Sequence, residues 1–396
     1  MAGIYIHIPF CKKACHYCDF HFSTSSQYKN ELVATLRSEL ILQKNYLKDE
    51  SIETIYFGGG TPSLLAADEL QMLIREITQH YNVLENAEIT LEANPDDLNP
   101  QKVKELRQSD INRFSIGIQS FFEEDLKWMN RAHTASEAQS SVKRIQDAGF
   151  ENITVDLIYG YPLLTDQKWL ENIQHIIELQ IPHVSSYVMT VEPATALASF
   201  ISKGKQQPMN EKQSADQFLI LMKQLNNAGF EHYEISNFAK PNRYSRHNSN
   251  YWKGVSYLGI GPSAHSFNGE TRQWNIANNA LYIESIARKI IPAEVEVLTT
   301  VNKVNEYIMT SLRTSWGMDL HKISKLFGPD YAKLVELGLE GFLDKNWLIH
   351  KDQIITLTTE GKLFADHIAL ELFVFEKEAY YKLDEVNLSK AEVFYN

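Results

Sequence analysis

Hydrophobic positions in the first 235 residues repeat one unit: a short run rich in β-branched residues, a loop, and a longer amphipathic segment. The short runs have the length and composition of buried strands, and they lie at 3–10, 52–60, 88–95, 113–120, 152–160 and 183–190. The longer segments carry apolar residues at helical spacing, and they lie at 26–44, 66–81, 100–109, 136–149, 167–180 and 211–229. Strands that alternate with helices predict a parallel sheet with right-handed crossovers. Because six units are fewer than the eight of a closed barrel, we expect an α/β fold with a partial (β/α)6 barrel, open as an arc, over residues 1–235.

The alternation stops after residue 235. Residues 236–294 are rich in aromatic residues, Asn and Gly and predict a loop-rich segment. From residue 295 to 376 we expect a separate C-terminal domain, with helices at 304–314, 319–328, 331–343 and 360–372 and a hairpin at 347–358. Helices followed by a hairpin indicate a winged-helix-like shape. Residues 377–396 are a mixed polar tail with no predicted element.

The charge balance argues against nucleic acid as a partner. The chain has 38 Lys and Arg against 50 Asp and Glu, a net charge of −12, whereas proteins that follow phosphate backbones carry basic surfaces. No run of eighteen apolar residues predicts a transmembrane segment, and the N-terminal residues lack the pattern of a signal peptide. We therefore expect a cytoplasmic protein, and peripheral contact with a membrane stays open.

All three cysteines lie together in the loop that follows the first predicted strand. Cys11, Cys15 and Cys18 have the spacing C-x3-C-x2-C. Three thiolates from one loop can hold three corners of a [4Fe–4S] cluster and leave its fourth iron open to a small chelating ligand. Two alternatives remain at this point: Cys15 and Cys18 form a thioredoxin-like redox pair, or one of the nearby histidines, His7, His16 or His21, completes a structural zinc site.

A glycine-rich turn, Gly58-Gly59-Gly60-Thr61-Pro62, closes the second predicted strand. Glycines allow the backbone to approach a ligand closely, and a tight turn from strand to helix explains them about as well. No Lys follows them, so the segment is not a Walker loop.

Taken together, these segments resemble the radical S-adenosylmethionine (SAM) enzymes, and more narrowly the branch of coproporphyrinogen III dehydrogenases and HemW-type haem chaperones. The resemblance runs from Tyr5 to about residue 375 through the blocks YIHIPFCKKACHYCDF, FGGGTPS, LEANPDD, RFSIGIQSF, NRAH and DLIYG. It implies a [4Fe–4S] cluster on the three cysteines and SAM on the open iron. Carried over position by position, it implies SAM contacts at Tyr5, Tyr17, Gly59, Gly60, Thr61, Glu92, Gln119, Arg131 and Asp156.

The residues themselves support several of these positions. Glu92 and Gln119 come at the ends of predicted strands, and Asp156 interrupts the apolar run ITVDLIY, where a carboxylate is costly unless it is paired or functional. For Arg131, a surface salt bridge is the alternative.

Within this branch, three features favour the haem chaperones. Phe20 stands where the dehydrogenases have a further cysteine, and the chain starts almost at Tyr5. Residues 247–252, HNSNYW, resemble the haem motif H-N-x-x-Y-W, which implies His247 as an axial haem ligand, with a structural histidine as the alternative. His265, in GIGPSAH, is a weaker ligand candidate. The resemblance thus implies a protein that binds a [4Fe–4S] cluster, SAM and haem and delivers haem to acceptor proteins, with oxygen-independent coproporphyrinogen III oxidation as the alternative.

Overall fold

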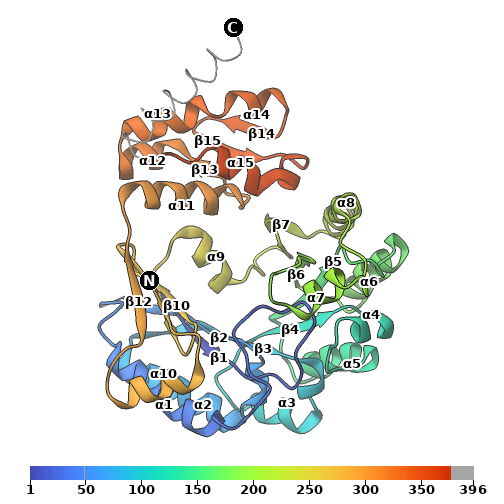
Figure 1. The fold of residues 1–396 in the computed structure, drawn as a ribbon, viewed down its shortest axis with the longest axis vertical. Helices are drawn as coiled ribbons and strands as arrows, with labels where there is room; N and C mark the ends of the chain where they lie inside the picture. The colour runs from blue at the N-terminus through green and yellow to red at the C-terminus, as the bar shows by residue number, and fades with distance from the viewer. Residues whose placement is uncertain (49, 376–396) are drawn as a thin grey trace. The chain divides into compact units, whose positions relative to one another are not determined.

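The computed structural model describes residues 1–48 and 50–375, which divide into two compact units (Figure 1). The first comprises residues 1–251 and 255–296, and the second comprises residues 252–254 and the chain from residue 297. The predicted tail at 377–396 lies outside the described residues.

The six predicted strand–helix units are present in the first unit. The parallel strands are β1 (Ala2–Ile8), β2 (Ile52–Gly59), β3 (Val83–Ala93), β4 (Arg113–Gln119), β5 (Ile153–Tyr159) and β6 (His183–Val188), adjacent in this order. The helices and short 3-10 turns between them are α1 (Lys29–Leu42), η1 (Pro62–Leu64), α2 (Ala67–His80), η2 (Pro95–Asp97), α3 (Pro100–Leu106), α4 (Glu123–Trp128), α5 (Ala135–Asp147), α6 (Asp166–Glu178), α7 (Ala196–Ser202) and α8 (Glu211–Asn227). The predicted partial α/β barrel is thereby confirmed, and Figure 1 shows α1, α2, α3 and α5 on the outer side of the curved sheet.

The segment predicted to be loop-rich extends this same sheet. It contains β8 (Asn237–Ala239), α9 (Arg246–Lys253), β9 (Tyr257–Ile260), β10 (His265–Phe267), β11 (Thr271–Asn275), α10 (Asn279–Ala287) and the start of β12 (Ala293–Val297), with β7 (Glu231–Glu234) just before it. Over the described residues, the sheet has twelve strands in the order β12-β11-β10-β9-β1-β2-β3-β4-β5-β6-β8-β7. Strand β9 runs parallel to β1, so residues more than 250 positions apart become neighbours. The two end strands of this order, β12 and β7, are not paired with each other, so the sheet is an open arc and not a closed barrel.

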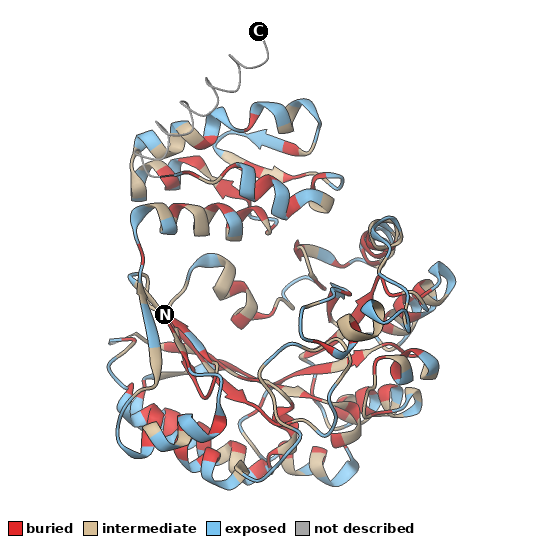
Figure 2. Cartoon of the chain, in the orientation of Figure 1, coloured by how far each residue is buried: buried red, intermediate tan, exposed pale blue. Residues whose placement is uncertain are grey.

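Side chains alternate between the two faces of the sheet. On β1, Ile4, Ile6 and Ile8 are fully buried toward the helices, whereas Tyr5 and His7 face the inside of the arc, where their side chains touch. Figure 2 shows buried residues concentrated where helices cover the strands. The apolar core therefore lies between sheet and helices, and the inner face is left for polar side chains.

Glu39 is a buried carboxylate on α1 that joins this helix to the added strands. Its oxygens accept hydrogen bonds from Gly261 N (2.8 Å), Asn275 Nδ2 (2.7 Å), Gln43 Nε2 (2.9 Å) and the hydroxyl of Tyr282. Burial raises the pKa of Glu39, while these donors lower it. A buried carboxylate with four donors fixes the β10–β11 hairpin against α1.

The second unit has the predicted hairpin and helices, except that the helix predicted at 331–343 is divided into two, α13 and α14. Its elements are α11 (Thr300–Leu312), β13 (Met318–Asp319), α12 (Leu320–Phe327), α13 (Pro329–Leu337), α14 (Glu340–Asp344), β14 (Leu348–Lys351), β15 (Ile354–Leu357), η3 (Gly361–Phe364) and α15 (Ala365–Glu371). The strands form a small sheet in the order β13-β15-β14, and the fully buried side chains of Ile308, Ile323, Ile355 and Ile368 contribute to its core. Within residues 1–48 and 50–375, no helix has the length and apolar character needed to span a membrane.

Candidate functional site

The cysteine loop begins where β1 ends, at the carboxyl edge of the parallel strands. Phe10 pairs with Ser23, and the amide of Cys11 donates to the carbonyl of Ser23 (3.0 Å), so the two ends of the loop are held together. All three thiols are free and half-buried. Active sites of parallel α/β barrels are built at this edge, because the loops after the strands converge there.

Two of the sulfur atoms have polar neighbours from other loops of the sheet edge. The hydroxyl of Thr61, after β2, donates to Cys11 Sγ (3.5 Å), and Arg131 Nη1 donates to Cys15 Sγ (3.4 Å). Asn94, after β3, connects them: its Oδ1 accepts from Arg131 Nη2 (2.7 Å) and its Nδ2 donates to Thr61 Oγ1 (3.4 Å). The structure therefore brings Thr61 and Arg131 to the cysteines.

Arg131 is not the surface salt bridge that was its alternative. Its guanidinium donates to Asn94 and to the carbonyl of Gly117 (2.7 Å) as well as to Cys15. Its Nε is buried and has no hydrogen-bond partner among the described residues. A buried donor without a partner is costly, so this atom fits an anionic group of a bound ligand.

Burial changes the acidity of the thiols. It raises the pKa of Cys18 to about 11 and also raises the pKa of Cys11, and the neighbouring cysteines add to both effects. The thiols of Cys11 and Cys18 are thus protonated near neutral pH. Because a bound metal stabilises thiolates, metal binding at this loop releases protons.

The glycine turn fits tightly against β1 and the cysteine loop. Gly60 N donates to the carbonyl of Ile8 (2.9 Å), and a Cβ at Gly60 would lie 2.7 Å from the carbonyl oxygen of Phe10. Gly59 has φ +106°, and a Cβ there would lie 2.6 Å from the ring of His7. Packing alone accounts for both glycines, so a SAM contact at either one stays a prediction.

Two carboxylates lie on either side of β4, Glu92 on β3 and Asp156 on β5. Glu92 accepts from the hydroxyl of Tyr56 (2.8 Å) and from Gly59 N (3.2 Å), and Asp156 accepts from Ser115 Oγ (3.2 Å). Burial raises the pKa of Glu92 to about 8 and that of Asp156 to about 6, and repulsion by Asp156 adds to the shift of Glu92. Glu92 therefore holds a proton at neutral pH, and a cation bound beside it would lower its pKa and favour the carboxylate.

The three remaining predicted contacts surround these groups. Gln119 ends β4 in a left-handed conformation, φ +66°, beside a register shift, which is strain of the kind found at functional sites. Tyr5 Oη lies 3.3 Å from His7 Nδ1, and its ring stacks on Tyr56. Burial raises the pKa of Tyr17, and the charge of Arg131 opposes that shift.

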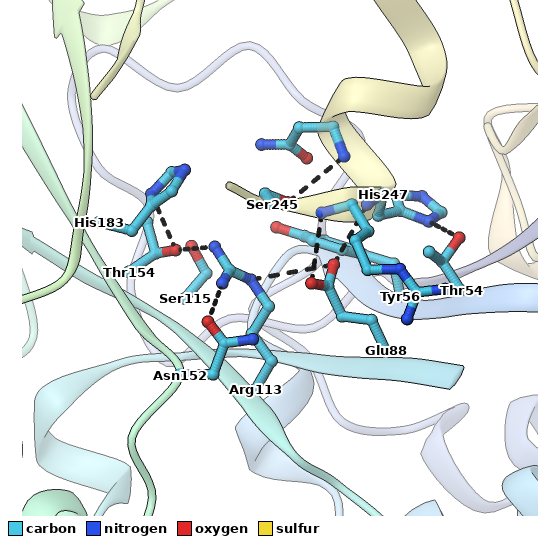
Figure 3. A network of polar contacts seen from close by, with 12 residues as sticks. Thr54, Tyr56, Glu88, Arg113, Ser115, Asn152, Thr154, His183, Ser245 and His247 are labelled. Atoms are coloured by element: carbon cyan, nitrogen blue, oxygen red, sulfur yellow. Dashed lines mark hydrogen bonds and ion pairs between the residues drawn. The ribbon is translucent and has the colours of Figure 1, made fainter. Parts of the chain in front are cut away.

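His247 lies deeper, toward the amino ends of the strands (Figure 3). It is 2% exposed in the first turn of α9, and its ring stacks on Tyr56 with centroids 4.9 Å apart. Nδ1 is hydrogen-bonded to Thr54 Oγ1 (2.8 Å) and Nε2 to Tyr251 Oη (2.9 Å). Burial lowers the pKa of His247 to about 3, so the ring is neutral with both nitrogens in use. These contacts are those of a structural histidine, and the haem-ligand role of His247 stays a prediction.

Figure 3 shows a network of polar contacts that continues from His247 across the neighbouring strands. The backbone amides of Arg246 and His247 donate to Glu88 on β3 (3.2 and 3.1 Å), and Glu88 faces Arg113 on β4, with Nε and Oε1 4.0 Å apart. The guanidinium of Arg113 also donates to Asn152 and Thr154, and Thr154 bonds to His183 Nδ1 (3.1 Å).

The alternatives for the cysteines receive no support from neighbouring histidines. His7 Nε2 bonds to the carbonyl of His21 (3.0 Å), and His16 Nδ1 bonds to the carbonyl of Trp128 (2.8 Å). Over residues 1–48 and 50–375, no three His, Cys, Asp or Glu side chains, the three cysteines included, are placed as around a metal ion, so both the zinc site and the cluster stay predictions.

Sequence reasoning missed Tyr56, Asn94 and the Glu88–Arg113 pair. The alternation of side chains between the two faces of a strand would have found two of them. Tyr56 lies two residues before Gly58 and therefore on the same face of β2, and Glu88 lies four residues before Glu92 and therefore on the same face of β3.

Comparison with known proteins agrees with this geometry. The radical SAM superfamily pattern matches residues 5–176, and that of the HemN C-terminal domain matches residues 298–364. The protein named heme chaperone HemW from Bacillus subtilis is 33% identical over 371 residues, 93% of this chain and 98% of its own. The HemW of Lactococcus lactis is also 33% identical, over 97% and 98%. Coproporphyrinogen III oxidase (HemN) of Escherichia coli has a similar fold, with a TM-score of 0.81 at 21% identity over 95% of this chain and 90% of its own.

Proposed function

Because the chain belongs to the HemW family of radical SAM proteins, we propose that it binds haem and delivers it to acceptor proteins. The observation that carries this proposal is the likeness to proteins named heme chaperones along nearly the full length of both chains. That likeness spans both units.

We further propose that Cys11, Cys15 and Cys18 hold a [4Fe–4S] cluster. Three thiols from one loop are a sulfur donor set suited to iron. Thr61 and Arg131 already donate to two of the sulfurs, and hydrogen bonds to cluster sulfurs stabilise their negative charge. When bound, such a cluster supplies one iron that no cysteine occupies, which is the coordination place for SAM.

The residues around the loop fit SAM by charge. Arg131 Nε is a buried donor without a partner, suited to the carboxylate of the methionine moiety. Glu92 and Asp156 are suited to its positive charges and ribose hydroxyls, because a cation between them relieves their mutual repulsion. The proposed contact set is Tyr5, Tyr17, Gly59, Gly60, Thr61, Glu92, Gln119, Arg131 and Asp156.

Oxidation of coproporphyrinogen III is the competing function. The coproporphyrinogen oxidase among the solved structures shares the fold at only 21% identity, which carries no activity to this chain. Phe20, where that branch has a further cysteine, is 69% exposed and supplies no sulfur ligand.

Anaerobic reconstitution with iron and sulfide tests the cluster. We expect about four irons per wild-type chain and loss of the broad iron–sulfur absorption in Cys15→Ala. Asp19→Ala, an exposed change in the same loop, is the control and should keep the full iron content. Four irons in Cys15→Ala would show that the ligand set is wrong.

A paired assay tests the function itself. Reconstituted protein with SAM and a chemical reductant is given haem in one experiment and coproporphyrinogen III in the other. We expect stoichiometric haem binding, transfer to an apo-haemoprotein, and no protoporphyrinogen. Porphyrinogen turnover without haem transfer would reject the chaperone proposal.

A further inference from the structure

Lys12, the residue after Cys11, forms ion pairs with two carboxylates that lie outside the cysteine loop. Its ammonium group lies 2.6 Å from Asp96 Oδ2 and also contacts a carboxylate oxygen of Asp97. Both acids belong to η2, the short turn that follows β3. Their side chains are only 12% and 6% exposed, and two neighbouring carboxylates in such a place repel each other unless a cation bridges them. Lys12 supplies that cation.

The turn η2 is in turn connected to the glycine turn and, through it, to the first cysteine. Asp97 Oδ2 accepts from Ser63 Oγ (2.7 Å), and the same hydroxyl accepts from the backbone amide of Asn94 (3.2 Å). Asn94 Nδ2 donates to Thr61 Oγ1 (3.4 Å), and the hydroxyl of Thr61 donates to Cys11 Sγ (3.5 Å). These contacts form a closed ring of six residues: Cys11, Thr61, Asn94, Ser63, Asp97 and Lys12.

The ring joins three segments that are far apart in the sequence: the cysteine loop, the glycine turn and η2. Thr61, Ser63 and Asp97 are buried, where hydrogen bonds are stronger than in water. A second branch reaches another cysteine, because Asn94 also accepts from Arg131, which donates to Cys15 Sγ. A loop that is already held in place loses less conformational entropy when it binds a ligand. The ring therefore favours a cysteine loop that is ordered before any iron arrives.

Lys13, the next residue along the chain, offers a matched comparison. It is exposed, and its ammonium group makes one long contact, 3.4 Å, with the carbonyl of Arg131. Within residues 1–48 and 50–375 it forms no ion pair with a carboxylate, whereas Lys12 bridges two. The two lysines carry the same charge in the same loop, so they differ in their connection to η2.

We propose that Lys12 is a positioning residue for the cluster, because its ion pairs with Asp96 and Asp97 close a ring that holds Cys11 and Thr61 in place for iron binding. This inference rests on the proposed [4Fe–4S] cluster and names a residue outside the ligand set on which that cluster depends.

Loss of iron to a chelator tests the proposal. Full-length wild type, Lys12→Met and Lys13→Met are reconstituted anaerobically and mixed with an excess of a ferrous-iron chelator. We expect Lys12→Met to lose iron about tenfold to a hundredfold faster than wild type, the range by which metal affinity falls when residues that orient ligands are replaced. Lys13→Met should lose iron at the wild-type rate.

Lys12→Arg is the conservative variant. A guanidinium can bridge two carboxylates, so this variant should lose iron at the wild-type rate. The electron paramagnetic resonance spectrum of the chemically reduced cluster gives a second measurement. Its g values should shift in Lys12→Met, since the cysteine ligands are held differently, and should return to the wild-type values in Lys12→Arg.

The double variant Lys12→Met with Asp96→Asn separates positioning from folding. It removes the repulsion between the two acids, so thermal unfolding of the ligand-free protein should match wild type even where Lys12→Met alone folds poorly. Iron loss should still be faster than in Lys13→Met, because the connection to η2 is absent.

Three results would overturn the assignment and leave the cluster proposal standing: equal rates of iron loss in Lys12→Met and Lys13→Met, no recovery in Lys12→Arg, or full recovery of the wild-type rate in the double variant. If the wild-type protein takes up no iron, the proposed cluster itself fails.

Discussion

Two carboxylates four residues apart on β3 face the inside of the same sheet, yet their surroundings differ. Glu88 accepts two backbone amides from the first turn of α9 and lies within 4.0 Å of Arg113 Nε. Glu92 accepts from Tyr56 and Gly59, is repelled by Asp156, and has no cationic partner in the part of the chain that the structure describes. In the lower layer, Glu88 is paired with Arg113. In the upper layer, Glu92 and Asp156 lie near each other, and Glu92 has no cation beside it among the described residues.

The difference separates structure from function within one strand. A buried charge is tolerated when it is paired, and an unpaired one raises the free energy of the folded state unless a ligand supplies the partner. We therefore expect Glu88 and Arg113 to contribute to stability, and Glu92 and Asp156 to contribute to the proposed SAM binding. Substitutions in the two layers should have opposite consequences.

The largest expected effect comes from breaking the lower layer. Arg113→Met leaves Glu88 buried without its cation, and we expect the free energy of unfolding to fall by about 3–5 kcal/mol in urea denaturation. The double variant Arg113→Met with Glu88→Gln should recover part of that loss, since the unpaired charge is gone. A loss below about 1 kcal/mol in Arg113→Met would remove the distinction between the layers.

The corresponding change in the upper layer should affect SAM instead. In reconstituted protein, Glu92→Gln should weaken SAM binding by about tenfold to a hundredfold, because hydrogen bonds to charged groups contribute about 1.5–3 kcal/mol. Equilibrium dialysis under anaerobic conditions measures this. Folded Glu88→Gln is the control, and an equal loss of SAM affinity there would contradict the assignment.

The smallest expected effect is in the pH dependence of the ligand-free protein. The pKa of Glu92 is raised to about 8, so the folded state holds a proton that the unfolded state releases at ordinary carboxyl pKa values. The stability from Glu92 is then present at low pH and lost as pH rises toward 8. Urea denaturation at several pH values should show Glu92→Gln flattening this fall by at least about 1.4 kcal/mol, the free energy of one pKa unit. An identical slope in wild type and variant would show that Glu92 ionises normally.

Local periodicity was enough to predict the six central strand–helix units, but not the strands added beside β1. Strands β9, β10 and β11 have four, three and five residues, too few to show alternation among Gly, Asn and aromatic residues. Their pairing depends on β1, which lies more than 250 residues earlier. The sequence alone therefore predicted a loop-rich segment at 236–294, whereas in the structure its pairing with distant strands makes this segment part of the sheet.

The site divides in a similar way. Cys11, Cys15, Glu92 and Arg131 could be located from motifs and strand ends, and the structure places them at one edge of the sheet. The environment of His247 could not be foreseen, because its partners Thr54 and Tyr56 come from β2 and only the fold brings α9 to them. A motif identifies a residue type, whereas the availability of its nitrogens depends on the fold.

The carboxylate of Glu39 has a mechanical consequence for this edge of the arc. The hairpin that follows Gly261 cannot swing outward without breaking the hydrogen bond from Asn275 to the buried carboxylate of Glu39, which would leave that carboxylate short of a donor. This edge of the arc is therefore a fixed wall, and a ligand could enter or leave beside it only without movement of the hairpin.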